Sequence, residues 1–156
     1  MKNIILITLT CFSLLNAEIQ KEYFVNGKIK VEASYRDGKL DGMYKDYFTN
    51  GNIKNEISYR DGIEDGMKKK YFSNNTLMFE RDMYNGKKDG MSKEYYENGT
   101  LISEIFYRDG LKDGLAKYYS RYGKLLEEIF YKNGEAISGY EYHNGVKVKI
   151  DIFDLK

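Results

Sequence analysis

Apolar and polar residues alternate along most of the chain, and the alternation is part of a pattern that repeats every 24 residues. Each unit begins with an aromatic pair, which is followed by an Asn-Gly step, a glutamate and two Asp-Gly or Asn-Gly steps. Alternation with a period of two is typical of a half-buried β-strand. We therefore expect an all-β fold, an elongated antiparallel meander of about five 24-residue hairpin repeats. The repeats start near Tyr23, Tyr47, Tyr71, Tyr95 and Tyr119.

Two kinds of glycine step predict the turns of each repeat. Asn-Gly between alternating runs, as at Asn50-Gly51, is typical of a two-residue hairpin in which both residues have positive φ. The paired Asp-Gly steps, as at Asp61-Gly62 and Asp65-Gly66, predict a longer second turn of about six residues. Each unit then consists of two strands and two turns. The whole chain is expected to contain about a dozen strands.

A two-residue loop at Asn50-Gly51 also fixes a register for the hairpin. It places Phe48 opposite Ile53 and Lys45 opposite Glu56. The same rule elsewhere predicts the apolar pairs Phe24/Ile29, Phe72/Leu77 and Tyr96/Leu101. It also predicts four more pairs of opposite charge, which would hold the register: Lys21/Glu32, Lys69/Glu80, Lys93/Glu104 and Lys117/Glu128.

The repeat changes character near the end of the chain. Gly139 is displaced by one residue, and residues 146–153 alternate like a closing strand. An atypical last unit is what an open repeat array needs at its edge. We expect residues 18–156 to form one repeat domain with a C-terminal cap at 136–156.

The first 17 residues have the pattern of a secretory signal peptide. Lys2 precedes an apolar run at residues 4–15, and Ala17 offers a cleavage site. The run is shorter than the roughly 20 apolar residues of a membrane span. A buried first strand and a lipoprotein anchored at Cys11 fit less well. The segment predicts a secreted or periplasmic protein of the cell envelope.

Composition removes several chemistries. The chain of 156 residues has one Cys and one His, too few for a disulfide framework or a Cys/His zinc site. Its 25 basic and 24 acidic residues give a net charge of +1, whereas nucleic-acid binding depends on a basic excess. We expect no nucleic-acid partner, no metal and no cofactor.

No group of residues in the sequence resembles a catalytic site. The glutamate series stands opposite lysines, which favours structural pairing over an acidic row. The spaced aspartates, such as Asp37 and Asp41, would be calcium ligands only if several oxygens met in one loop, and aspartate in a glycine turn more often caps its own backbone. His143 stands alone. We therefore expect a protein that is not an enzyme.

The unit at residues 47–69, YFTNGNIKNEISYRDGIEDGMKK, resembles the bacterial variant of the MORN repeat. Departures are local: Asn75 replaces a turn glycine, Tyr122 replaces a turn asparagine, and Met83 replaces a tyrosine. The resemblance implies a twisted antiparallel sheet with a concave face for protein–protein or membrane-proximal contacts. Some bacterial relatives carry an antitoxin label. The motif YYENG at residues 95–99 is also similar to aromatic-glycine repeats that bind wall polymers.

These patterns favour a non-enzymatic secreted or envelope interaction module that presents a sheet surface to a protein partner. The alternatives are a glycan- or cell-wall-binding module with an envelope polymer as ligand, a contact with a membrane surface, and an antitoxin-like partner of a toxin. The candidate binding aromatics are Tyr47, Tyr71, Tyr95 and Tyr119.

Overall fold

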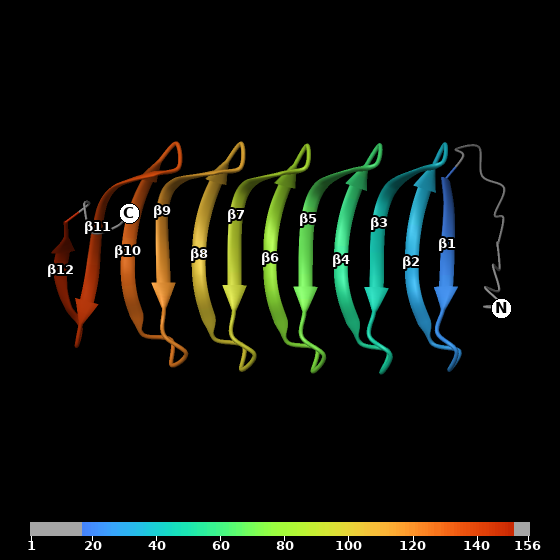
Figure 1. Ribbon diagram of the computed structural model, residues 1–156, viewed down its shortest axis with the longest axis horizontal. Coiled ribbons are helices and arrows are strands. Elements are labelled where there is room, and N and C mark those ends of the chain that lie inside the picture. Colours follow the sequence, from blue (N-terminus) through green and yellow to red (C-terminus); the bar gives the residue numbers. More distant parts are fainter. Residues whose placement is uncertain (1–16, 152–156) are drawn as a thin grey trace.

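The computed structural model describes residues 17–151, which form a single antiparallel sheet of 12 strands in strictly sequential order (Figure 1). The all-β meander is confirmed. No helix in the described range is long and apolar enough to cross a membrane. The strands are β1 Ala17–Tyr23, β2 Ile29–Arg36, β3 Lys39–Tyr47, β4 Ile53–Arg60, β5 Ile63–Tyr71, β6 Leu77–Tyr84, β7 Lys87–Tyr95, β8 Leu101–Arg108, β9 Leu111–Tyr119, β10 Leu125–Lys132, β11 Glu135–His143 and β12 Val146–Ile150.

The first of the two Asp-Gly or Asn-Gly steps after the glutamate of each repeat forms the tight hairpin turn. Asp37 and Gly38 have φ values of 50° and 76°, and Arg36 pairs directly with Lys39. Positive φ at both central residues is what a type I′ turn requires, and Asp-Gly tolerates it well. The predicted six-residue second turn is therefore wrong, because the chain reverses within two residues.

The second Asp-Gly step lies inside the following strand as a bulge. Ala33 pairs with Tyr44 and Tyr35 with Leu40, so Ser34 alone faces the three residues 41–43. Gly42 has a φ of 110°, and a Cβ atom built on it would lie 3.0 Å from the Cβ of Ser34. Glycine is required here both by the backbone angle and by the close approach of the neighbouring strand.

The Asn-Gly turns that follow the aromatic pairs are longer than the sequence predicts. The N–H of Gly51 donates to the carbonyl of Phe48, and the N–H of Phe48 donates to the carbonyl of Asn52. Of Asn50 and Gly51, only Gly51 has positive φ, while the Asn50 side chain accepts the N–H of Asn52 at 2.9 Å. Asparagine is therefore used for this side-chain bond and not for a left-handed backbone.

This longer loop makes the predicted apolar pairs wrong. Ile53 pairs with Tyr47 and not with Phe48, because a bulge shifts the register between Asp46 and Tyr47. The same shift occurs in the other hairpins. There Tyr23, Tyr71 and Tyr95 form the cross-strand pair that was expected of the aromatic residue after each of them. Lys45 still pairs with Glu56, as predicted, because it lies beyond the bulge.

Departures from the repeat keep the same turn. Asn75, which stands where other units have glycine, adopts a φ of 69°. Where Tyr122 replaces the turn asparagine, the Ser120 hydroxyl accepts the N–H groups of Tyr122 and Lys124 instead. The turn geometry is thus preserved by different side chains.

Turns of successive repeats are tied to one another by hydrogen bonds. The N–H of Gly62 donates to the carbonyl of Leu40 at 2.7 Å, and the equivalent bonds recur at Gly86, Gly110 and Gly134. At the other edge, the Asn50 amide donates to the carbonyl of Ser73 at 3.1 Å. These bonds link strands that are two apart and stabilise the stacking of repeats.

A single-layer sheet has no conventional core. The buried apolar residues of the described range lie in one row across the sheet, where Ile105 pairs with Ala116 and Ala116 with Ile129. Even here no large side chain is fully buried. The remaining members of the buried set are Ala33 and Ile57.

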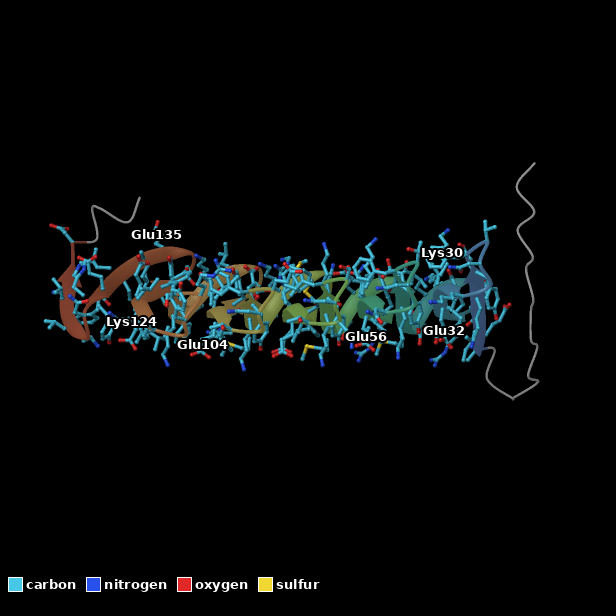
Figure 2. All side chains as sticks on the ribbon, turned by 90° about the horizontal axis from the view of Figure 1, so that it is seen from below. Lys30, Glu32, Glu56, Glu104, Lys124 and Glu135 are labelled. Carbon is cyan, nitrogen blue, oxygen red and sulfur yellow. The ribbon has the colours of Figure 1, made fainter. Side chains whose placement is uncertain are left out.

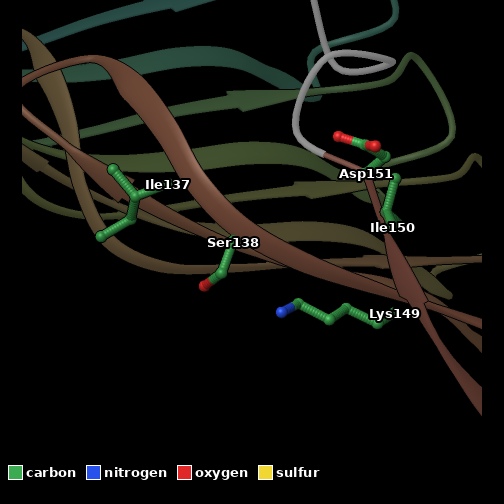
Figure 3. Close-up of a pocket in the computed structure, with 5 residues that line it drawn as sticks. All are labelled: Ile137, Ser138, Lys149, Ile150 and Asp151. Atoms are coloured by element: carbon green, nitrogen blue, oxygen red, sulfur yellow. The ribbon is translucent and has the colours of Figure 1, made fainter.

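The last repeat is irregular, as expected of a cap. Phe130 pairs with Ser138 and Tyr131 with Ala136, so the bulge in β11 contains one extra residue, whereas the bulge of a regular repeat contains two. A shallow hollow of about 400 Å³ lies between β11 and β12, lined by Ile137, Ser138, Lys149, Ile150 and Asp151 (Figure 3). The closing strand extends over Val146–Ile150, and residues 152–156 lie outside the described range, as do residues 1–16 of the predicted signal peptide.

The bulge glycines provide a direct test of the fold. A Cβ atom at Gly90 would lie 2.7 Å from the Cβ of Asp82, whereas one at Gly114 would lie 3.9 Å from the Cβ of Phe106. The φ values, 116° and 111°, are nearly the same. Gly114→Ala should therefore cost only the strain of a left-handed alanine, about 1–2 kcal/mol, and Gly90→Ala clearly more. Urea unfolding measures both, and equal losses would contradict the bulge geometry.

Candidate functional site

The two faces of the sheet carry different side chains. Because side chains alternate along a strand, Met43, Lys45 and Tyr47 of β3 share one face, and Tyr44 and Asp46 lie on the other. We call the first the Lys/Glu face, after the charged row that crosses it. It is defined by Lys21, Glu32, Lys45, Glu56, Lys69, Glu80, Lys93, Glu104, Lys117 and Glu128.

The charged row is continuous from β1 to β10. Lys45 pairs with Glu56 through the Asn-Gly hairpin, as predicted, and with Glu32 through the Asp-Gly hairpin. The sequence pattern does not predict the second pairing, because it favours a long turn at the Asp-Gly segment. The same double pairing recurs in every repeat, so lysine and glutamate alternate strand by strand. Figure 2 shows Glu32, Glu56 and Glu104 along the same side of the sheet.

Several members of the row are close enough for ion pairs. The Nζ to Oε1 distance is 3.2 Å for Lys21 and Glu32 and 3.3 Å for Lys45 and Glu56. Lys117 contacts Glu104, its partner across the Asp-Gly hairpin of the same repeat, at 3.4 Å. Within the described residues, Lys69 and Lys93 form no such ion pair. Because these side chains are part-exposed, each pair contributes well under 1 kcal/mol to stability, and their main effect is on register.

The predicted binding aromatics lie on this face beside the charged row. Tyr71, Tyr95 and Tyr119 donate their hydroxyls to glutamates of the preceding repeat: Glu56 at 2.7 Å, Glu80 at 3.0 Å and Glu104 at 2.8 Å. Tyr47 occupies the equivalent position near Glu32. Three of these four tyrosines therefore have a structural hydrogen bond in addition to any contact with a ligand.

These contacts shift the pKa of the groups involved. Burial, together with the bond to glutamate, raises the pKa of Tyr71, Tyr95 and Tyr119 to about 12. Burial alone would raise the pKa of Glu56, but the bonds from Tyr71 and Lys45 outweigh it and lower the pKa. The bonds from Tyr142 and Lys147 lower the pKa of Glu128 in the same way.

An exposed apolar row runs parallel to the charged row on the same face. It recurs every 24 residues and was missed in the sequence, although its spacing is visible there. Single exposed apolar residues are normal on a protein surface, but an aligned row marks a candidate contact surface. We call it the apolar stripe; its members and exposed fractions are Ile19 (52%), Met43 (41%), Met67 (40%), Met91 (38%) and Leu115 (39%).

The opposite face is occupied by contacts within the sheet. The Lys112 ammonium lies 4.5 Å from the centre of the Tyr131 ring and donates to the hydroxyl of Tyr118 at 3.0 Å. Tyr44 and Tyr59 pack edge to face at 6.2 Å. This face therefore presents fewer unengaged apolar groups than the Lys/Glu face.

The aspartates of the Asp-Gly steps have protein partners. The Asp41 carboxylate lies 3.4 Å from the Arg36 guanidinium and accepts the N–H of Asp61, in the next turn, at 3.4 Å. In the described range no group of three or more His, Cys, Asp or Glu side chains could hold a metal ion. His143 contacts Glu141 at 3.1 Å at the C-terminal end of β11.

The sequence matches the family described as MORN repeat variant over residues 19–37, 40–61, 88–109 and 112–133, together more than half of the chain. The unmatched third repeat contains Asn75 and Met83, yet β5 and β6 form the same hairpin there. No curated protein matches the chain.

The tyrosine–glutamate bonds predict a loss of stability at high pH. A tyrosine of the unfolded chain titrates near pH 10, whereas Tyr71, Tyr95 and Tyr119 keep their protons up to about 12 in the folded state. The unfolded state therefore binds fewer protons in this window, so the free energy of unfolding falls as pH rises from about 10 to 12.

Replacing the three tyrosines by phenylalanine should make this dependence shallower. The measurement is urea unfolding at a series of alkaline pH values. Tyr122→Phe is the matched control, because this side chain is 91% exposed in a turn. An unchanged slope in the triple variant would show that the hydroxyl–carboxylate bonds do not form.

Proposed function

Because the chain belongs to the MORN repeat variant family, we propose that it is a non-enzymatic interaction module that binds a protein partner through its Lys/Glu face. Repeats of this family are generally non-enzymatic. The proposal is carried by one observation, the apolar stripe, which keeps side chains such as Met67 and Met91 about 40% exposed at the same level of every second strand. Such a row can lose its contact with water only against another molecule.

The surroundings of the stripe favour a protein as the partner. Protein interfaces combine an apolar centre with a polar rim, and here the stripe is flanked by lysines and glutamates in equal number. A balanced row of charges selects a partner with a matching pattern, and it offers no excess of positive charge to anionic lipid or nucleic acid.

We also propose that the interaction takes place outside the cytoplasm, at the cell envelope or after secretion. The support for this is the sequence of residues 1–17 alone, in which Lys2 precedes the apolar run and Ala17 follows it.

Capture experiments with the purified protein test this function. The immobilised protein is exposed separately to envelope proteins and to purified wall polymer. We expect a specific protein to be retained, and we expect Met67→Glu/Met91→Glu to abolish its retention, because charges are placed at the centre of the stripe. Val25→Glu/Val146→Glu is the control, since these apolar residues are also exposed, 110% and 63%, but lie in the loop after β1 and at the start of β12, away from the stripe.

The opposite outcome identifies the glycan alternative. Retention on wall polymer alone, unaffected by Met67→Glu/Met91→Glu and lost when Tyr47, Tyr71, Tyr95 and Tyr119 become alanine, would show a polymer-binding module and overturn the protein partner.

A further inference from the structure

The charged row of the Lys/Glu face is complementary in charge to the same row of a second copy, when the strands of that copy follow in the reverse order. From β1 to β10 it alternates lysine and glutamate, beginning with Lys21 and ending with Glu128. A half-turn about an axis parallel to the strands, passing between β5 and β6, exchanges the two ends of the row. Every lysine of one copy then lies over a glutamate of the other, for example Lys69 over Glu80 and Lys93 over Glu56.

We infer that the Lys/Glu face pairs with the same face of a second copy of this chain in a two-fold symmetric dimer. This inference rests on the proposed function and identifies its protein partner as the chain itself. A two-fold interface uses one patch on both subunits, so it requires the self-complementary pattern that this row has. If one copy were displaced by one strand relative to the other, like charges would lie over one another. The charged row therefore specifies how the two copies are aligned.

The apolar stripe agrees with the same symmetry. Phe106 and Phe130 occupy the stripe's row on β8 and β10, where they pair with Met91 and Leu115. The half-turn lays Ile19 over Phe130 and Met43 over Phe106 of the second copy. Met67 lies over Asp82, whose carboxylate already accepts the N–H of Met91 at 2.9 Å. Ile19 and Met43 thus meet aromatic side chains, whereas Met91 and Leu115 lie over the serines of the same row, Ser58 and Ser34.

The size of the face is sufficient for a stable dimer. Ten strands at the usual spacing extend over roughly 45 Å. The three rows of side chains, which are the apolar stripe, the charged row and the tyrosines beside it, extend over about 15 Å along the strands. The contact would bury about 700 Å² on each copy, close to the roughly 800 Å² of a standard interface. Figure 1 shows that the axes of the antiparallel strands β1 to β10 are nearly parallel to one another, which allows the two rows to stay aligned near the axis.

Two single charge reversals beside the axis test the pairing. Lys69→Glu places glutamate over Glu80 of the second copy, and Glu80→Lys places lysine over Lys69, so each variant opposes its own self-association. In a mixture of the two variants, both contacts become attractive again. The effect of each substitution on its own sheet is the same alone and in the mixture, so recovery on mixing reports contact between copies.

Sedimentation velocity of the purified protein over a range of concentrations measures the result. We expect a wild-type dimer, at least tenfold weaker self-association in each variant, and recovery in the equimolar mixture. Lys70→Glu is the matched control, because it makes the same charge change on the opposite face of β5 and should leave the dimer intact. Circular dichroism verifies that each variant is folded.

A monomeric wild-type protein, or a mixture that associates no better than its components, would overturn the dimer. If the wild type is monomeric but Met67→Glu/Met91→Glu still abolishes capture of an envelope protein, the dimer is wrong and the proposed function stands. If the wild type is monomeric and retains no protein at all, both are wrong.

Discussion

The structure depends on strand register, which must be specified without a second layer. In a sandwich, the apolar side of each strand is identified by the sheet packed against it. Here the buried row contains only small or medium side chains such as Ala116 and Ile129, and no large side chain is fully buried. Rows of matched side chains therefore have to specify the pairing. A slip of one residue at Lys45 would remove it from Glu32 and Glu56 together.

The turns and the bulges preserve this register from repeat to repeat. The Asp-Gly turn reverses the chain within two residues. The bulge at Gly42 then accommodates the extra residues, so that Lys45 still pairs with Glu32. Because the period is the same in every unit, chemically similar residues stack in straight rows. The charged row and the apolar stripe are consequences of that regularity, so the feature that stabilises the fold also creates the surface that we propose as the interface.

The alternation of residues predicted the fold class, the number of strands and the hairpin pairing of Lys45 with Glu56, because these depend on local pattern. The turns were predicted less well. Asn-Gly was interpreted as a left-handed pair, but Asn50 uses its side chain to accept a backbone N–H instead. The Asp65-Gly66 step is predicted as part of a turn, but that glycine is needed because the backbone has positive φ in a bulge and because Ser58 of β4 approaches closely. The bond of Asn50 is local to its turn, whereas the need for Gly66 comes from a contact between strands that sequence spacing does not show. The apolar stripe was visible in the spacing but not recognised, since its exposure depends on which face each residue occupies.

A double-mutant cycle on Lys45 and Glu56 tests the central claim most directly. Lys45→Gln, Glu56→Gln and the double variant are unfolded in urea, with Lys45→Gln/Glu104→Gln as a distant pair for comparison. The account predicts that Lys45 and Glu56 are coupled by about a few tenths of a kcal/mol, while the distant pair is additive. Additive effects at Lys45 and Glu56 would show that the charged row does not specify the register.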